Sequence, residues 1–125
     1  MRQIGLILGC IALIVLSAVY CLPNHPSAGN ASTLDAAVHI GLFAGIGLWF
    51  GWFAGHRARV FLPLFALAAL LEVAQWRLGH FPHVEWRDIA ANEAGLGLSW
   101  LLLWRRASSD GGGAASDEPV DPADG

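Results

Sequence analysis

The sequence predicts an all-α membrane protein, with four transmembrane helices in a small bundle and both termini in the cytoplasm. Of its 125 residues, 55% are hydrophobic and 14% are charged, whereas a soluble domain carries about 25% charged residues. Four long apolar runs are separated by short polar segments. All seven basic residues are arginines, and five of them lie on one side of the membrane if the runs alternate in direction. The expected partner is therefore a lipid bilayer, and nothing resembles a basic nucleic-acid footprint.

The first predicted span covers residues 4–22, which contain no charged group. A cleaved signal peptide is the alternative, because Arg2 precedes the run. The run is longer than the usual apolar core of a signal peptide, about 7–15 residues, and the bulky Tyr20 precedes Cys21. We therefore expect a retained span. Cys10 and Cys21 would lie about 16 Å apart on one helix, too far for a disulfide.

The next three predicted spans cover about residues 36–55, 60–76 and 87–104. A bilayer core of about 30 Å takes roughly 20 helical residues. The runs show no alternation with a period of two, so strands are not indicated. Residues 1–106 therefore form the predicted membrane domain. Residues 107–125 are rich in Gly, Ala, Ser, Pro and Asp, carry five acids and no base, and are expected to be a disordered acidic cytoplasmic tail.

The arginines predict the orientation, since cytoplasmic segments carry the excess of positive charge. The outer side would receive only Arg77 and Arg87. The cytoplasmic side would receive Arg2, Arg57, Arg59, Arg105 and Arg106. The chain is thus expected to be a multi-pass protein of the cell (inner) membrane.

Polar residues occur in pairs near the outer ends of three spans. Each pair is spaced by three or four residues, which places its members on one helix face. The pairs are Asp35 with His39, Glu72 with Gln75, and Asp88 with Asn92. The orientation inferred from the arginines puts all six at the same depth. The sequence therefore predicts a single outward-facing polar site.

Glu72 is the strongest candidate in this site, because it lies inside the apolar run, where a charged group facing lipid is costly. If the site is catalytic, Glu72 is the expected base: burial favours its neutral form, which lets it exchange protons near neutral pH. The candidate catalytic residues are Glu72, His39 and Asp88. The candidate binding residues are Asp35, Gln75, Asn92, Arg77 and Arg87.

A structural alternative stands beside each of these assignments. Asp35 and Asp88 could act only as caps of the helices they begin. His39 could be a hydrogen-bonded core residue. The whole set could also be an interhelical lock, that is, a group of polar contacts whose only role is to hold the helices together. Whether the protein is an enzyme therefore stays open.

The sequence does not predict a metal site or a cofactor. His80, His83, Glu85 and Asp88 offer ligand types that suit zinc. However, there is no HExxH on a helix and no CxxC, and two histidines in a loop are weak grounds for a site.

Small residues recur along two of the spans and predict close helix packing. They are Gly41, Gly45, Gly47, Gly51 and Gly55 in the second span, and Ala91, Gly95 and Ser99 in the fourth.

Together these motifs resemble the VanZ-like family of small bacterial inner-membrane proteins, named for a teicoplanin-resistance accessory protein. The resemblance rests on Asp35-x-x-x-His39, Glu72-x-x-Gln75 and Asp88-Ile-Ala-Ala-Asn92-x-x-Gly95, and it covers about residues 32–103.

Two positions depart from the family pattern. Ala36 stands where many members have Lys, and Phe81-Pro82 stands where they carry an Arg. Arg77 or Arg87 is the candidate to supply that cation.

The resemblance implies a role in the cell envelope or in resistance to glycopeptide antibiotics such as teicoplanin. The residues suit an amphiphile with a polar head, such as a lipid-linked envelope precursor or a lipoglycopeptide. The alternative is a non-enzymatic membrane structural or interaction protein.

Overall fold

The computed structural model describes residues 1–20, 33–78 and 83–111, and every element in these ranges is an α-helix. The four helices are α1 (Arg2–Tyr20), α2 (Thr33–Ala54), α3 (Ala58–Leu78) and α4 (Trp86–Gly111). The prediction of an all-α chain with four helices is thereby confirmed.

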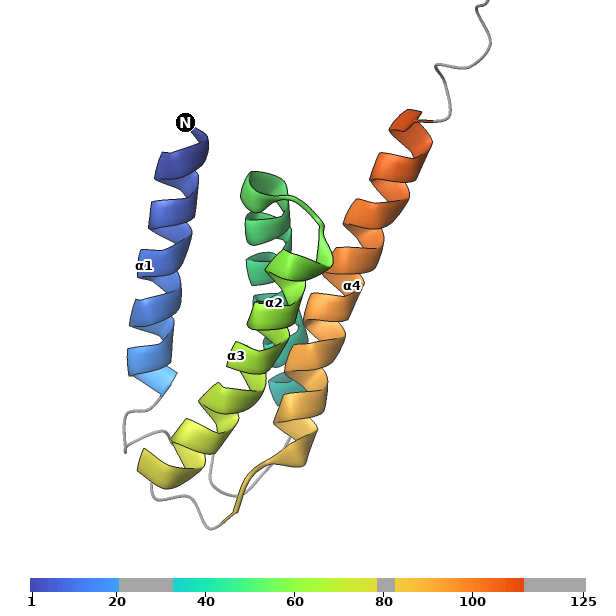
Figure 1. Ribbon diagram of the computed structural model, residues 1–125. Coiled ribbons are helices and arrows are strands. Elements are labelled where there is room, and N and C mark those ends of the chain that lie inside the picture. Colours follow the sequence, from blue (N-terminus) through green and yellow to red (C-terminus); the bar gives the residue numbers. More distant parts are fainter. Residues whose placement is uncertain (21–32, 79–82, 112–125) are drawn as a thin grey trace, which may run out of the picture.

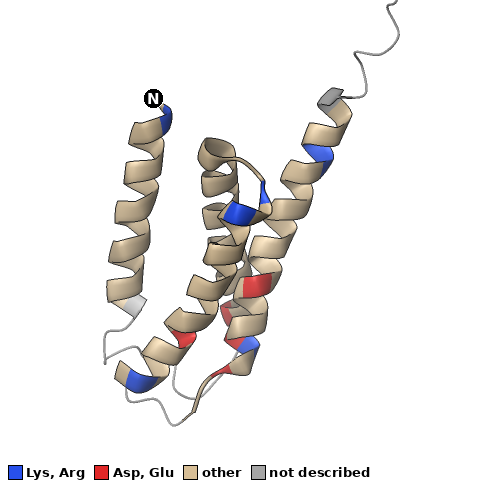
Figure 2. Ribbon diagram, viewed as in Figure 1, with Lys and Arg blue, Asp and Glu red and all other residues tan. Residues whose placement is uncertain are grey.

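Successive helices run in opposite directions, as Figure 1 shows. α2 and α4 pack together along much of their length, α3 packs against α4 and α2, and α1 contacts only α2 and α3 among the described elements. The start of α1, the α2–α3 connection and the end of α4 share one end of the bundle (Figure 1). Five arginines therefore lie toward that end and two toward the other (Figure 2), the same grouping that the sequence predicted.

Three of the helices are long and apolar enough to cross a membrane. They are Arg2–Val19, with a mean hydropathy of 2.1, and Thr33–Ala54 and Ala58–Leu78, with 1.6 each. α4 is not among them, because Asp88, Glu93 and the arginines near its end interrupt its apolar stretch. Large apolar side chains are exposed along all four helices, among them Ile14, Trp52, Leu62 and Trp104. Such a surface is typical of a protein embedded in lipid.

The helices differ most from the sequence-based spans at two boundaries, and by one or two residues at the others. α2 begins at Thr33, three residues before the predicted span. α4 continues to Gly111, so residues 107–111, which the sequence placed in a disordered tail, are helical. In this extension the hydroxyls of Ser108 and Ser109 donate to the carbonyls of Trp104 and Arg105, one turn back, which is compatible with continued helix. The remainder of the predicted tail lies outside the described residues.

α1 is fastened to α2 near the end of the bundle that carries most arginines. The Arg2 guanidinium donates to the carbonyl of Phe53, and to that of Ala54 at 3.2 Å. These carbonyls end α2, where a cation also interacts favourably with the helix dipole. Trp49 Nε1 donates to the carbonyl of Gly5 at 3.0 Å. Gly55, with a φ of 99°, then ends α2 in the left-handed conformation that glycine tolerates.

α2 and α4 approach each other so closely that a Cβ atom would not fit at two glycines of their interface. A side chain at Gly95 would collide with the backbone of Ile40 and Ala44, and one at Gly47 would collide with Ser99. Only small residues permit this separation. The interface therefore brings the polar faces of α2 and α4 into direct contact.

Gly41 and Gly45 of α2 line an apolar groove between α1 and α2. Its cavity of about 610 Å³ is bounded by Gly41, Leu42, Gly45 and Trp49 of α2 and by α1 residues such as Leu13. A Cβ atom added at Gly41 or Gly45 would meet no other atom within 4 Å. α1 therefore leaves this part of α2 uncovered.

We predict that Gly95→Ala destabilises the bundle by about 1–3 kcal/mol, because the added methyl group overpacks the interface against backbone that cannot move aside. The matched control is Gly97→Ala, since a Cβ at Gly97 meets nothing within 4 Å. The control should leave stability unchanged or raise it by up to about 1 kcal/mol through helix propensity. Unfolding by titration of SDS into mixed micelles, followed by circular dichroism, measures both. Equal stability of the two variants would contradict the proposed close contact.

Candidate functional site

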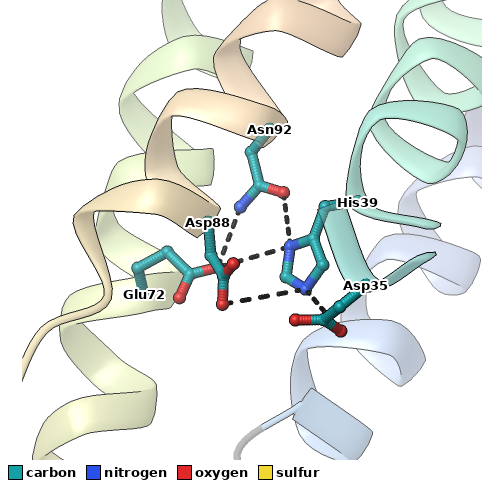
Figure 3. Close-up of polar contacts among 5 residues, drawn as sticks. All are labelled: Asp35, His39, Glu72, Asp88 and Asn92. Atoms are coloured by element: carbon teal, nitrogen blue, oxygen red, sulfur yellow. Dashed lines mark hydrogen bonds and ion pairs between the residues drawn. The ribbon is translucent and has the colours of Figure 1, made fainter. Parts of the chain in front are cut away.

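The polar residues of three helices meet inside the bundle. Asp35 and His39 come from α2, Glu72 from α3, and Asp88 and Asn92 from α4 (Figure 3). Glu72 is 2% exposed, Asp88 7%, His39 9%, and Asn92 not at all. We refer to these five residues as the polar cluster. The sequence-based expectation that they converge agrees with this geometry.

Local sequence explains how each helix presents its members. Asp35 and Asp88 are each the third residue of their helices, where the positive end of the helix dipole favours a carboxylate. His39 and Asn92 follow them by four residues and therefore share their faces. Neither Asp stands at the cap position itself. The carboxylates of both lie 3.9 Å from Nε2 of His39 on α2, so helix capping alone does not explain their positions.

Asn92 is the centre of the cluster. Its Nδ2 donates to Glu72 Oε1 at 2.9 Å, and its Oδ1 lies 2.9 Å from His39 Nδ1 (Figure 3). An amide oxygen only accepts hydrogen bonds, so His39 Nδ1 is the donor to it. This single side chain therefore links α2, α3 and α4, and it places a hydrogen on Nδ1 of the imidazole.

The opposite edge of the imidazole faces two carboxylates. His39 Nε2 lies 3.9 Å from Asp35 Oδ1 and 3.9 Å from Asp88 Oδ2 (Figure 3). Glu72 Oε1 is also 3.9 Å from Nδ1. One imidazole is thus surrounded by three carboxyl groups, an arrangement that suits either a protonated imidazole or a cation beside Nε2.

Glu85 extends the negative region just before α4 begins. Partial burial raises the pKa of its carboxyl, and the neighbouring Asp88 carboxylate raises this pKa further. Glu85 was considered in the sequence only as a loop ligand for zinc.

Three of the candidate binding residues are not part of the polar cluster. Gln75 lies one turn beyond Glu72, but it makes none of the hydrogen bonds that join the residues of the polar cluster. The Arg77 guanidinium carbon lies 4.3 Å from the ring centroid of Trp76. Arg87 is exposed in the first turn of α4.

The geometry also differs from the only metal arrangement considered in the sequence. His83 is exposed, and His80 lies outside the described residues. Among the described residues, the group of His, Cys, Asp and Glu side chains with ligand atoms close enough to share an ion is Asp35, His39 and Asp88, all within 4.8 Å of one another. The i, i+4 pairs were visible in the sequence, but their meeting at one ring nitrogen was not.

No protein-family model, no curated protein and no solved structure matches this chain. The resemblance to the VanZ-like family therefore rests on the motif residues alone.

We predict that Asn92→Ala destabilises the fold by about 1–3 kcal/mol, because His39 Nδ1 and Glu72 Oε1 both lose a buried partner. Ser99→Ala is the matched control: Ser99 is equally buried on α4, yet its hydroxyl donates only to the carbonyl of Leu96 in the same helix, at 2.7 Å. It should lose at most about 1 kcal/mol. The same SDS titration measures both variants, and a smaller loss for Asn92→Ala than for Ser99→Ala would refute the central role of Asn92.

Proposed function

We propose that the chain is a VanZ-like protein of the cell (inner) membrane, which crosses the bilayer four times and keeps both termini in the cytoplasm. In this proposal the polar cluster is an outward-facing site for the head group of a cell-envelope amphiphile. The observation that carries it is the burial of two carboxyl groups, one imidazole and one amide together in an otherwise apolar bundle, with the partly exposed carboxyl group of Asp35 beside them. Intramembrane ionisable groups of this kind mark functional sites by default.

Two features support the fourth crossing and the orientation. The polar side chains of α4 that lower its hydropathy include Asp88, Asn92 and Ser99, and all three are buried within the bundle and so removed from lipid. The end of the bundle with most arginines is the end expected in the cytoplasm. The polar cluster lies toward the opposite end, which would face outward.

An amphiphile fits because an apolar groove lies on the same face of α2 as Asp35, two helical turns further along the helix. Asp35, Leu42 and Trp49 are spaced by seven residues, two helical turns, and so share one face of α2. Leu42 and Trp49 line the groove between α1 and α2, and Asp35 belongs to the polar cluster with its side chain 32% exposed. An alkyl chain in the groove would therefore hold its head group at Asp35. A lipid-linked envelope precursor and a lipoglycopeptide both have this shape.

The second candidate function is a non-enzymatic structural or interaction protein whose polar cluster is an interhelical lock. It is favoured by the complete pairing of the cluster, since every buried side-chain nitrogen and oxygen among the described residues has a hydrogen-bond partner. Such locks contribute only about 0.6 kcal/mol per pair on average. The two functions differ in their response to Glu72→Gln, which preserves shape and an acceptor oxygen but removes the acid.

The orientation predicts opposite labelling of two single-cysteine variants, built in a Cys10→Ala, Cys21→Ala background. His83→Cys, just before α4, should react in intact cells with a thiol reagent that cannot cross membranes. Ser109→Cys, at the other end of α4, should react only after lysis. The reverse pattern, or equal labelling of both variants in intact cells, would overturn the proposed orientation.

The function predicts teicoplanin protection in a sensitive Gram-positive host. Wild-type protein should raise the minimal inhibitory concentration, and Glu72→Gln at matched membrane levels should return it to the value of the empty vector. Glu93→Gln is the control, because Glu93 lies next to Asn92 on α4 but outside the polar cluster. Protection retained by Glu72→Gln would favour the interhelical lock, and no protection by wild type would remove the glycopeptide role.

A further inference from the structure

We propose that Asp35, His39 and Asp88 bind a divalent first-row metal ion through Oδ1, Nε2 and Oδ2. His39 Nε2 is 3.9 Å from each carboxylate oxygen, and the three ligand atoms lie within 4.8 Å of one another. Two ligands at about 2.1 Å from a shared ion are at most about 4.2 Å apart. Both His–Asp separations already satisfy this limit. A movement of the partly exposed Asp35 carboxylate toward Asp88 would bring the remaining separation, which is at most 4.8 Å, within it.

The hydrogen bond at the other edge of the imidazole supports the same site independently. Asn92 Oδ1 accepts from Nδ1, so the neutral ring carries its lone pair on Nε2, the nitrogen that faces both carboxylates. Metal-bound histidines almost always donate their other N–H to a carbonyl or carboxylate, which orients the ring and raises its basicity. Asn92 is itself held by Glu72. The polar cluster thus contains both the ligands and the groups that orient them.

The donor set indicates the class of metal. One imidazole nitrogen and two carboxylate oxygens suit Zn²⁺ or Mn²⁺, whereas Mg²⁺ prefers oxygen alone. Three protein ligands also leave a position open on the ion, as in catalytic rather than structural zinc sites. Asp35 is the most exposed of the three ligands, with its side chain 32% exposed, so an ion would enter the site from its side.

A proton on Nε2 is the competing occupant, because an imidazolium would also satisfy Asp35 and Asp88. A measurement of the metal bound per molecule of purified protein distinguishes the two occupants. Its result depends neither on the orientation of the chain in the membrane nor on any effect of teicoplanin. The metal site is therefore tested separately from the proposed function.

The test uses the full chain purified in a neutral detergent, stripped with a chelator, dialysed against Zn²⁺ or Mn²⁺, and analysed for metal by mass spectrometry. Wild type should retain about one equivalent of Zn²⁺ and bind Mn²⁺ more weakly, as the order of divalent affinities requires. His39→Gln and Asp88→Asn should lose stoichiometric binding. Glu93→Gln should retain it. The absence of stoichiometric Zn²⁺ in wild type would overturn the site and favour the proton.

Two further variants separate loss of the site from loss of folding. Asp35→Asn changes a partly exposed side chain near the start of α2, so helicity and elution volume should be unchanged while zinc affinity falls. Asn92→Ala should weaken zinc binding about 10–100-fold, as expected for a group that orients a ligand. Co²⁺ in place of Zn²⁺ reports the geometry through visible absorption, which His39→Gln should abolish. Equal zinc affinity of wild type, His39→Gln and Asp35→Asn would show adventitious binding and overturn the proposal.

Discussion

The amide of Asn92 is the contact on which the rest of the polar cluster depends. A carboxyl group and an imidazole buried between apolar helices each require a partner, since an unpaired polar group in such a place is costly. Asn92 serves both, donating to Glu72 and accepting from His39. An amide can do so with one side chain, because its nitrogen donates and its oxygen accepts. Three helices are thereby held in register at the same depth.

This contact in turn requires the close approach of α2 and α4. Gly95 lies against the backbone of Ile40 and Ala44, and Gly47 lies against Ser99. Larger residues at these positions would separate the helices and move Asn92 away from His39. The glycines therefore act on the polar cluster without belonging to it. Their main contribution is geometric, because in lipid the association of helices depends on packing and on hydrogen bonds between helices.

Much of this arrangement could be predicted from periodicity and charge. The spacing of Asp35 from His39, and of Asp88 from Asn92, placed each pair on one face, and the arginines placed the pairs at one depth. The sequence could not show which of two glycine sets packs against α4. Gly47 and Gly51 are buried, whereas Gly41 lines a groove. Glycines carry no side-chain polarity that would distinguish the two faces, and only the contact itself does.

For a related reason, the sequence could not predict the central role of Asn92. Nor could it predict that two carboxylates face the same ring nitrogen of His39. Residue type and spacing define a helix face, but the rotation of α4 about its axis decides which member of that face meets α2. A rotation by one residue, about 100°, would turn Asn92 away from His39 and bring Glu93 toward α2. Contact between Gly95 and Ile40 determines this rotation. For the same reason, the sequence directed attention to histidines in a loop when metal ligands were considered.

The charge of the polar cluster decides which head group it can accept. With a proton on His39, three carboxyl groups and one imidazolium leave a negative site, which attracts a cationic head and repels phosphate. A divalent ion between Asp35 and Asp88 changes this balance, because it neutralises two carboxylates and offers an open position to an anionic oxygen. Metal ions held by a few carboxylates commonly bind phosphate-bearing substrates in this way. The occupant of the space beside Nε2 therefore determines whether a lipid-linked phosphate or an amine is the better partner. That dependence links the proposed metal to the proposed amphiphile through charge alone.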